Sequence, residues 1–194
     1  MGSMKFNNSE TRIKCFGVDS SNNPIASKNV EVLFYNSEDD FAIKLKTKEG
    51  EEVILYKTTG ENKSFEENYE EIKKQQRGYY GKTTFEEDDM LRIPFIKVNA
   101  EINYDELCGR EIKNRKSYIK QALQTIDFEL NNVGGSVKSE AVIDSTQKVL
   151  TEKPRKMIFD SDFILYLKEE NKEQPYFALK VDNTGVLVPN NVDE

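Results

Sequence analysis

Two apolar, strand-like segments joined by a long polar tract constrain this chain more than any other feature of its sequence. The first segment ends near residue 130 and is followed by Gly134 and Gly135, and the second begins near Met157. The tract of about twenty residues between them has no apolar period, and loops of that length in a compact domain are usually functional or disordered. We therefore expect the tract to be exposed and to carry the function of the domain whose strands flank it.

The absence of histidine removes several kinds of active site at once. With no His in the chain, Ser-His and Cys-His catalysis and His-containing zinc sites are excluded. The two cysteines, Cys15 and Cys108, are too few for a zinc ribbon, and we expect two reduced thiols, with a single bridge between them as the alternative. No carboxylate stands in an apolar setting that would mark a raised pKa, which also disfavours a glycosidase-type carboxylate pair. The sequence predicts no catalytic residues, no cofactor and no metal site.

The net negative charge of the chain disfavours two classes of binding partner. A net charge of −7 disfavours nucleic acid and anionic membranes, because binding to phosphates needs a basic surface. No apolar run approaches the ~20 residues that a membrane span requires. No signal peptide is present, and the first four residues look like an expression scar, so we expect a cytoplasmic protein, with a removed leader as the alternative.

Alternating hydrophobic positions predict a β-rich α+β domain built from antiparallel hairpins. Residues 41–46 and 52–57 form one predicted hairpin, and residues 11–18 and 29–35 form another. Residues 90–102 are predicted to be a long strand in which Pro94 marks an edge, a bulge or a change of sheet. Residues 157–167 and 175–181 are predicted to pair as a closing hairpin. We expect residues 1–10 to be a disordered tag region, residues 11–188 a single domain and residues 189–194 a tail.

Helical signals are few. Ser64 followed by Glu67 is a capping box, and Phe65, Tyr69 and Ile72 then form one apolar stripe at helical spacing, which indicates core packing, with a partner groove as the alternative. A helical turn is expected over residues 104–107. Residues 118–130 fit both periods, and we expect a short helical turn that runs into a strand from about residue 125.

Five stretches, taken in order, resemble the C-terminal half of a serpin, the family of serine protease inhibitors. Residues 118–134 are similar to the family pattern without a gap, with Asn131 and Gly134 at its most characteristic positions. The other four stretches are similar to the family's strands, helix and closing hairpin: residues 41–71, 91–107, 159–167 and 171–181. The resemblance implies a truncated serpin core in which residues 135–156 form the reactive loop. Its candidate residues are then Gly134, Gly135, Gln147, Lys148 and Val149, with the scissile bond after Lys148.

The same comparison argues against inhibition. Lys138 and Glu140 lie in the hinge, where an inserting loop needs small or apolar side chains on its inward face. In one register both charges would be buried unpaired, which is costly, and in the other Val137, Ser139 and Ala141 would face inward, which is tolerable. The helical N-terminal half of a serpin has no counterpart in this sequence, so the resemblance implies that a loop could add only to an open sheet edge. We therefore expect a non-enzymatic, non-inhibitory protein-binding domain that also pairs with itself as an edge-strand homodimer. The alternative is a protease inhibitor or bait that uses residues 135–156.

Overall fold

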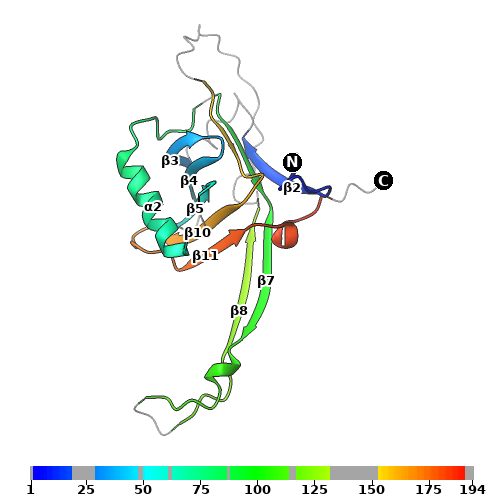
Figure 1. The fold of residues 1–194 in the computed structure, drawn as a ribbon, viewed down its shortest axis with the longest axis vertical. Helices are drawn as coiled ribbons and strands as arrows, with labels where there is room; N and C mark the ends of the chain where they lie inside the picture. The colour runs from blue at the N-terminus through cyan, green and yellow to red at the C-terminus, as the bar shows by residue number, and fades with distance from the viewer. Residues whose placement is uncertain are drawn as a thin grey trace.

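The computed structural model describes residues 2–18, 29–47, 50–60, 63–86, 88–113, 117–131 and 153–190. It confirms a β-rich α+β fold in which three sheets and one long helix make up most of the described chain (Figure 1). A compact body holds the five-stranded and four-stranded sheets. A two-stranded ribbon extends away from this body, which gives the molecule its elongated outline in Figure 1.

The five-stranded sheet is the centre of the body. Its order is β11 (Phe177–Val181), β10 (Phe163–Glu169), β5 (Glu51–Lys57), β4 (Asp40–Lys46) and β3 (Val30–Ser37), and all neighbours are antiparallel. The predicted hairpin of residues 41–46 and 52–57 is confirmed as β4 and β5, and the predicted closing hairpin is formed by β10 and β11. Because both faces of the sheet are covered, its central strands read as nearly continuous apolar runs.

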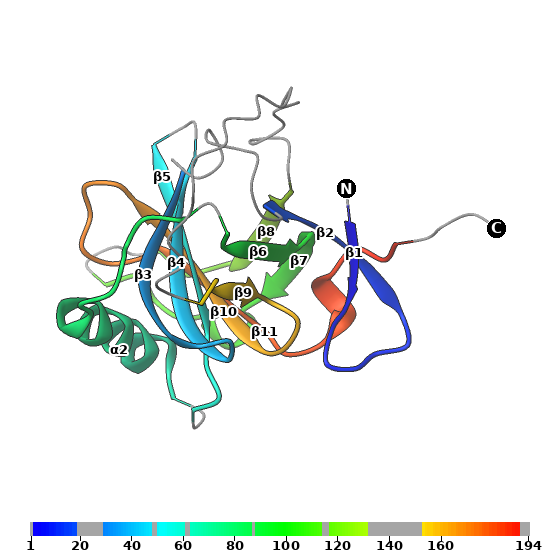
Figure 2. The same cartoon turned by 90° about the horizontal axis from the view of Figure 1, so that it is seen from above.

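One face of this sheet packs under the helix, α2 (Phe65–Gly78), as Figure 2 shows from above. The capping box is present: Ser64 Oγ accepts from the Glu67 N–H, and Glu67 accepts from the Ser64 N–H. Tyr69 and Ile72 are buried against the sheet as predicted, whereas Phe65 is 46% exposed at the first turn. The stripe is therefore mainly core packing, and Tyr166 fastens the helix by donating a hydrogen bond to the Phe65 carbonyl at 2.8 Å.

The other face packs on the four-stranded sheet, ordered β1 (Gly2–Lys5), β2 (Arg12–Val18), β6 (Met90–Pro94) and β9 (Lys156–Ile158). The prediction that residues 1–10 are disordered is wrong, because residues 2–5 form a strand on β2 and Phe6 is fully buried. The predicted pairing of residues 11–18 with 29–35 is also wrong: β2 pairs with β1 and β6, and β3 pairs with β4. Alternation predicts strands, but it does not specify their partners.

Pro94 marks a change of sheet, which is one of the three alternatives that the sequence left open. β6 ends at Pro94, and β7 (Ile96–Asn103) continues into the ribbon, where it pairs with β8 (Leu123–Leu130). A short 3-10 helix, η1 (Asp105–Leu107), confirms the helical turn predicted over residues 104–107, and a second one, η3 (Thr184–Val186), lies near the base of the ribbon. Because proline has no N–H to give to the β6 ladder, the chain can leave one sheet here and enter another.

Two local predictions are corrected. Residues 117–122 contain no helical turn, because this segment follows β7 and the connector as extended backbone before β8 begins. The single strand predicted over residues 157–167 is two strands, β9 and β10, which belong to different sheets. Between them, buried Lys57 donates to the Ile158 carbonyl and to Asp160, which holds the bend. The two apolar segments lie on either side of Asp160, Ser161 and Asp162, and both face the same core.

The cysteines do not form a bridge. Cys15 is buried in the four-stranded sheet, Cys108 is exposed beyond η1, and neither thiol is part of a disulfide. In the described ranges no helix is long and apolar enough to cross a membrane.

Candidate interaction site

The predicted reactive-loop residues Gly134, Gly135, Gln147, Lys148 and Val149 lie outside the described residues, as does the hinge with Lys138 and Glu140. Their assignment stays a prediction. The structure does describe both anchors of this tract, residue 131 on one side and residue 153 on the other. The site is therefore built from the elements that hold these two ends.

The N-terminal anchor is the base of the ribbon. Leu130, the last residue of β8, lies opposite Ile96, which is fully buried where β7 leaves the body. Phe128 packs against Phe177 of β11, with the ring centroids 5.6 Å apart. The backbone of Leu187 pairs with Ile96 on the outer side of β7. The described residues that precede the tract therefore end at a packed junction between the ribbon and the body.

The C-terminal anchor is a buried ion pair between Arg155 and Asp89, of which Asp89 is 2% exposed. The Asp89 carboxylate accepts the backbone N–H of Arg155 at 3.0 Å and the Nε–H of its guanidinium at 3.1 Å. The guanidinium also donates to the carbonyls of Lys82 and Thr84. Burial lowers the pKa of Arg155, but the hydrogen bonds and charge of Asp89 outweigh it and raise the pKa. The pair holds β9 beside β6 and fixes the point at which the tract ends.

The ribbon itself, residues 96–130, is called the arm below. Its register places apolar residues opposite one another on one face, with Val98 opposite Phe128 and Ala100 opposite Ile126. The other face is polar, with Lys97 opposite Glu129 and Asn99 opposite Asp127. The arm is thus an amphipathic two-stranded sheet. Such ribbons have marginal stability alone, and they usually need a third strand or a packed face.

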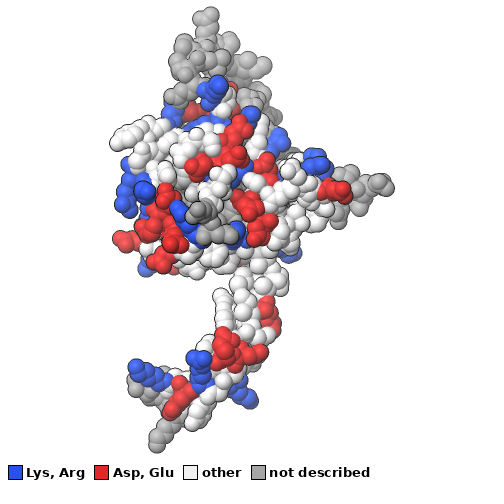
Figure 3. All heavy atoms as spheres, in the orientation of Figure 1, with Lys and Arg blue, Asp and Glu red and all other residues white. Residues whose placement is uncertain are grey.

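The body covers the apolar face of the arm only near its base. Ile96 and Val98 are buried, and the side chains of Ala100 and Ile126 are half-buried against the body's core. Further out, the apolar surface is exposed. Of the seven large hydrophobic side chains exposed in the described residues, four lie on the arm. Ile102 continues its apolar face, Leu123 lies on its polar face, and Ile112 and Tyr118 lie in the connection between β7 and β8. Figure 3 shows the arm as a slender projection with charges of both signs and much uncharged surface between them.

The edges of the sheets also differ in how they are protected. The outer edge of β3 is covered by residues 83–84, since Val32 N–H donates to the Thr83 carbonyl at 2.8 Å. The base of β7 is covered by residues 187–188. β1, β9 and β11 are short edge strands of three to five residues. Within the described ranges, β8 has eight residues and no strand or bridge pairs with its outer side.

Buried charges elsewhere in the body are structural. Glu52, 6% exposed, binds Lys168 at 2.5 Å and Lys44 at 3.3 Å. Burial raises the pKa of Glu52, but the hydrogen bond from Lys168 and the charge of Lys44 lower it overall, so the carboxylate is ionised at neutral pH. Lys168 also donates to the carbonyls of Glu169 and Lys172, which closes the turn between β10 and β11. Among the described residues no cluster of His, Cys, Asp and Glu could hold a metal ion.

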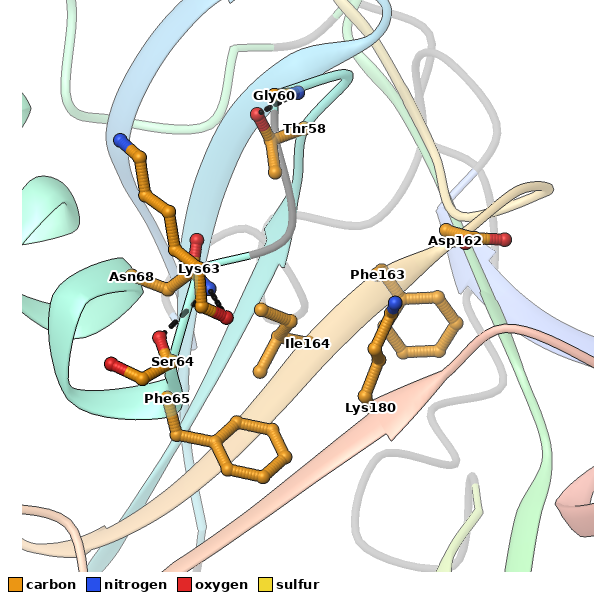
Figure 4. Close-up of a pocket in the computed structure, with 10 residues that line it drawn as sticks. All are labelled: Thr58, Gly60, Lys63, Ser64, Phe65, Asn68, Asp162, Phe163, Ile164 and Lys180. Carbon is orange, nitrogen blue, oxygen red and sulfur yellow. Dashed lines mark hydrogen bonds between the residues drawn. The ribbon is translucent and has the colours of Figure 1, made fainter.

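One cavity of about 320 Å³ lies beside the first turn of α2 and against β10 and β11 (Figure 4). Its polar groups include Ser64, which caps the helix, and Asn68, whose amide donates to the carbonyls of Lys63 and Ser64. Phe65 and Ile164 supply its apolar lining. Because these polar groups complete the helix cap, the cavity is best explained as part of the docking of α2 onto the sheet.

The sequence matches no protein-family model, and no curated protein matches it. Its fold is similar to solved serpin structures. Serpin48, a highly specific serpin of the insect Tenebrio molitor, superposes with a TM-score of 0.50 at 16% identity, covering 92% of this chain and 49% of that chain. The chain has the fold of about half a serpin. Thyroxine-binding globulin in complex with thyroxine gives 0.55 at 12% identity, covering 94% and 49%, and human glycosylated kallistatin gives 0.57 at 13%, covering 93% and 49%.

The serpin likeness shows the fold alone, because identity is low and the chain spans about half the length of these serpins. It confirms the resemblance inferred from the five sequence stretches. Sequence reasoning did not predict the arm as a separate, exposed element, nor the ion pair of Arg155. The alternation of residues 96–103 and 123–130 signals two half-buried strands, but it does not show that the body covers only part of their apolar face.

Proposed function

We propose that the chain is a non-catalytic protein-binding domain whose binding surface is the arm, and that it does not act as an inserting protease inhibitor. The observation that carries this proposal is the outer edge of β8, which no described residue pairs with, next to an apolar face that the body covers only in part. An unpaired edge offers a row of backbone donors and acceptors to an added strand, and the side chains beside it select the partner.

The chemistry of the described residues supports binding rather than catalysis. The most deeply buried ion pairs, Arg155–Asp89 and Lys168–Glu52, join strands and turns within the body. Exposed apolar side chains are instead concentrated on the arm, where they are in contact with solvent. Exposed apolar surface of this kind marks sites of protein interaction.

A proline substitution on the outer edge of β8 tests this proposal. Tyr104 N–H donates to the Ala122 carbonyl at 2.9 Å, so residues 104 and 122 are a hydrogen-bonded pair. Because hydrogen-bonded pairs alternate along antiparallel strands, even-numbered residues of β8 turn their backbone groups toward β7, and odd-numbered residues turn theirs outward. Thr125→Pro therefore removes an outward N–H without removing a hydrogen bond between β7 and β8. Thr125→Val is the matched control, because it keeps the N–H and favours a strand.

The assay compares the proteins that the wild-type chain and both variants retain from an extract of the source cells. We expect the wild type and Thr125→Val to retain the same partner and Thr125→Pro to lose it, with urea unfolding of the body unchanged in all three. Equal retention by Thr125→Pro would show that the edge of β8 is not the binding surface.

The second candidate function is a protease bait in which residues 135–156 are the ligand. Its support is the firm anchoring of the tract at both ends, by the packed base of the arm and by the Asp89–Arg155 pair. Under this hypothesis trypsin cleaves first after Lys148, and Lys148→Ala removes that cleavage. If trypsin first cuts elsewhere, the bait hypothesis loses its basis. If cleavage after Lys148 leaves the melting temperature unchanged, insertion of the loop is ruled out.

A further inference from the structure

In the part of the chain that the structure describes, the arm combines an open edge with a side-chain pattern that is complementary to itself. Odd-numbered residues of β8 present their N–H and C=O groups outward, and these are Leu123, Thr125, Asp127 and Glu129. A second β8 can pair with these groups only when odd-numbered residues face odd-numbered residues. Pairing of odd-numbered with odd-numbered residues also places the apolar faces of both arms on the same side of the combined sheet, because side chains alternate with the same period of two residues.

The two carboxylates on this edge select one register among the two-fold symmetric arrangements. With Ile126 opposite Ile126, Thr125 faces Asp127 and Leu123 faces Glu129, so no carboxylate opposes another. Moving the symmetry axis to Asp127 sets two Asp127 side chains against each other, and moving it to Phe128 sets Asp127 against Glu129. Like charges directly opposite each other destabilise an antiparallel pair. Moving the axis toward Leu123 avoids repulsion, but it shortens the paired segment.

We infer that the partner of the arm is a second copy of this chain, joined by antiparallel pairing of β8 with β8 about a two-fold axis at Ile126. The result is a four-stranded sheet in the order β7, β8, β8 of the second copy and β7 of the second copy. Each two-stranded arm then gains two further strands, and a four-stranded sheet exceeds the two strands that leave a ribbon marginal. The inference rests on the proposed function, since it names the partner of the same surface.

A disulfide between the two copies of residue 126 tests the register in which the two β8 strands pair. In this pairing Ile126 and its copy form a non-hydrogen-bonded pair, for which the Cα atoms lie about 4.5 Å apart, within the range of a disulfide. Residue 124 faces residue 128 of the other copy, so two copies of residue 124 lie four residues, or about 13 Å, apart. Cys108 is exposed and is replaced by serine in every variant to remove competing thiols.

We expect Ile126→Cys to form a covalent dimer under mild oxidation and Gln124→Cys to remain monomeric on a non-reducing gel. Gln124 is exposed, so this control leaves the core intact. The mass in solution, measured by light scattering over a range of concentrations without oxidant, should approach twice that of one chain. Thr125→Pro should return it to the mass of one chain, and Thr125→Val should not.

The other outcomes overturn the inference in distinguishable ways. A dimer in which positions 124 and 126 cross-link equally rejects the register. A mass that grows without limit indicates head-to-tail pairing of β7 with β8 and rejects the two-fold axis. If the chain is a monomer at all concentrations and retains another protein that Thr125→Pro loses, self-pairing is rejected and the proposed function stands. A monomer whose retained proteins are insensitive to Thr125→Pro rejects both.

Discussion

Replacing Asp89 by asparagine should unfold much of the anchor that ends the polar tract. Asp89 is 2% exposed, and its carboxylate accepts from the backbone and guanidinium of Arg155 and from the Glu86 N–H at 2.8 Å. Asparagine has nearly the same shape, but it removes the negative charge and turns an amide donor toward a group that also donates. The Arg155 side chain, 12% exposed, then stays buried without a counter-ion.

The size of the expected loss in unfolding free energy follows from the burial of the Arg155 side chain. Removing one partner of a buried ion pair costs about 3–5 kcal/mol. For a chain of this size 1 kcal/mol shifts the melting temperature by roughly 2–4 °C, so we expect Asp89→Asn to lower it by about 6–20 °C. Urea unfolding measured by circular dichroism gives the free energy directly, provided that the slope with denaturant is unchanged.

The next residue along the chain supplies the control. Lys156 pairs with Glu38 at 3.2 Å, but both side chains are more than half exposed. Glu38→Gln should therefore change the free energy of unfolding by no more than about 1 kcal/mol. If Asp89→Asn costs no more than Glu38→Gln, burial of the Arg155 pair does not stabilise this anchor and the reasoning is refuted.

Two further predictions concern the body. A Cβ at Gly17, whose φ is +155°, would lie 1.8 Å from the Leu91 carbonyl oxygen. Gly17→Ala should therefore destabilise the four-stranded sheet by roughly 3 kcal/mol or more in urea unfolding. A Cβ at Gly78 meets open space, so the control Gly78→Ala should be nearly neutral. Because the pKa of Glu52 is lowered in the folded state, its contribution to stability is present above its unfolded pKa of 4.5 and is lost as the pH falls below that value. Glu52→Gln should flatten the acid limb of stability against pH, and an unchanged acid limb would contradict this ionisation.

Local signals in the sequence predicted the elements that depend on near neighbours. The β4–β5 hairpin follows from alternation across a short turn, and α2 follows from the capping box of Ser64. Pro94 predicted an edge, a bulge or a change of sheet, because a missing N–H disrupts the ladder whatever surrounds it, and the structure contains the change of sheet. The serpin resemblance also came from the order and spacing of short motifs, and the similar solved structures confirm it at the level of the fold.

The sequence by itself determined the fold class, the main helix, most of the strands and the absence of histidine chemistry, because these depend on residue type and on short-range periodicity. Only the tertiary structure decided that residues 2–5 complete a sheet, that β9 and β10 belong to different sheets, and that Asp89 reaches Arg155 across 66 positions. It also decided that the body covers only part of the arm. Strand partners and solvent exposure depend on which segments, distant in the sequence, pack beside a strand. The period-two pattern of a two-stranded ribbon is the same whether or not a third strand pairs with the ribbon.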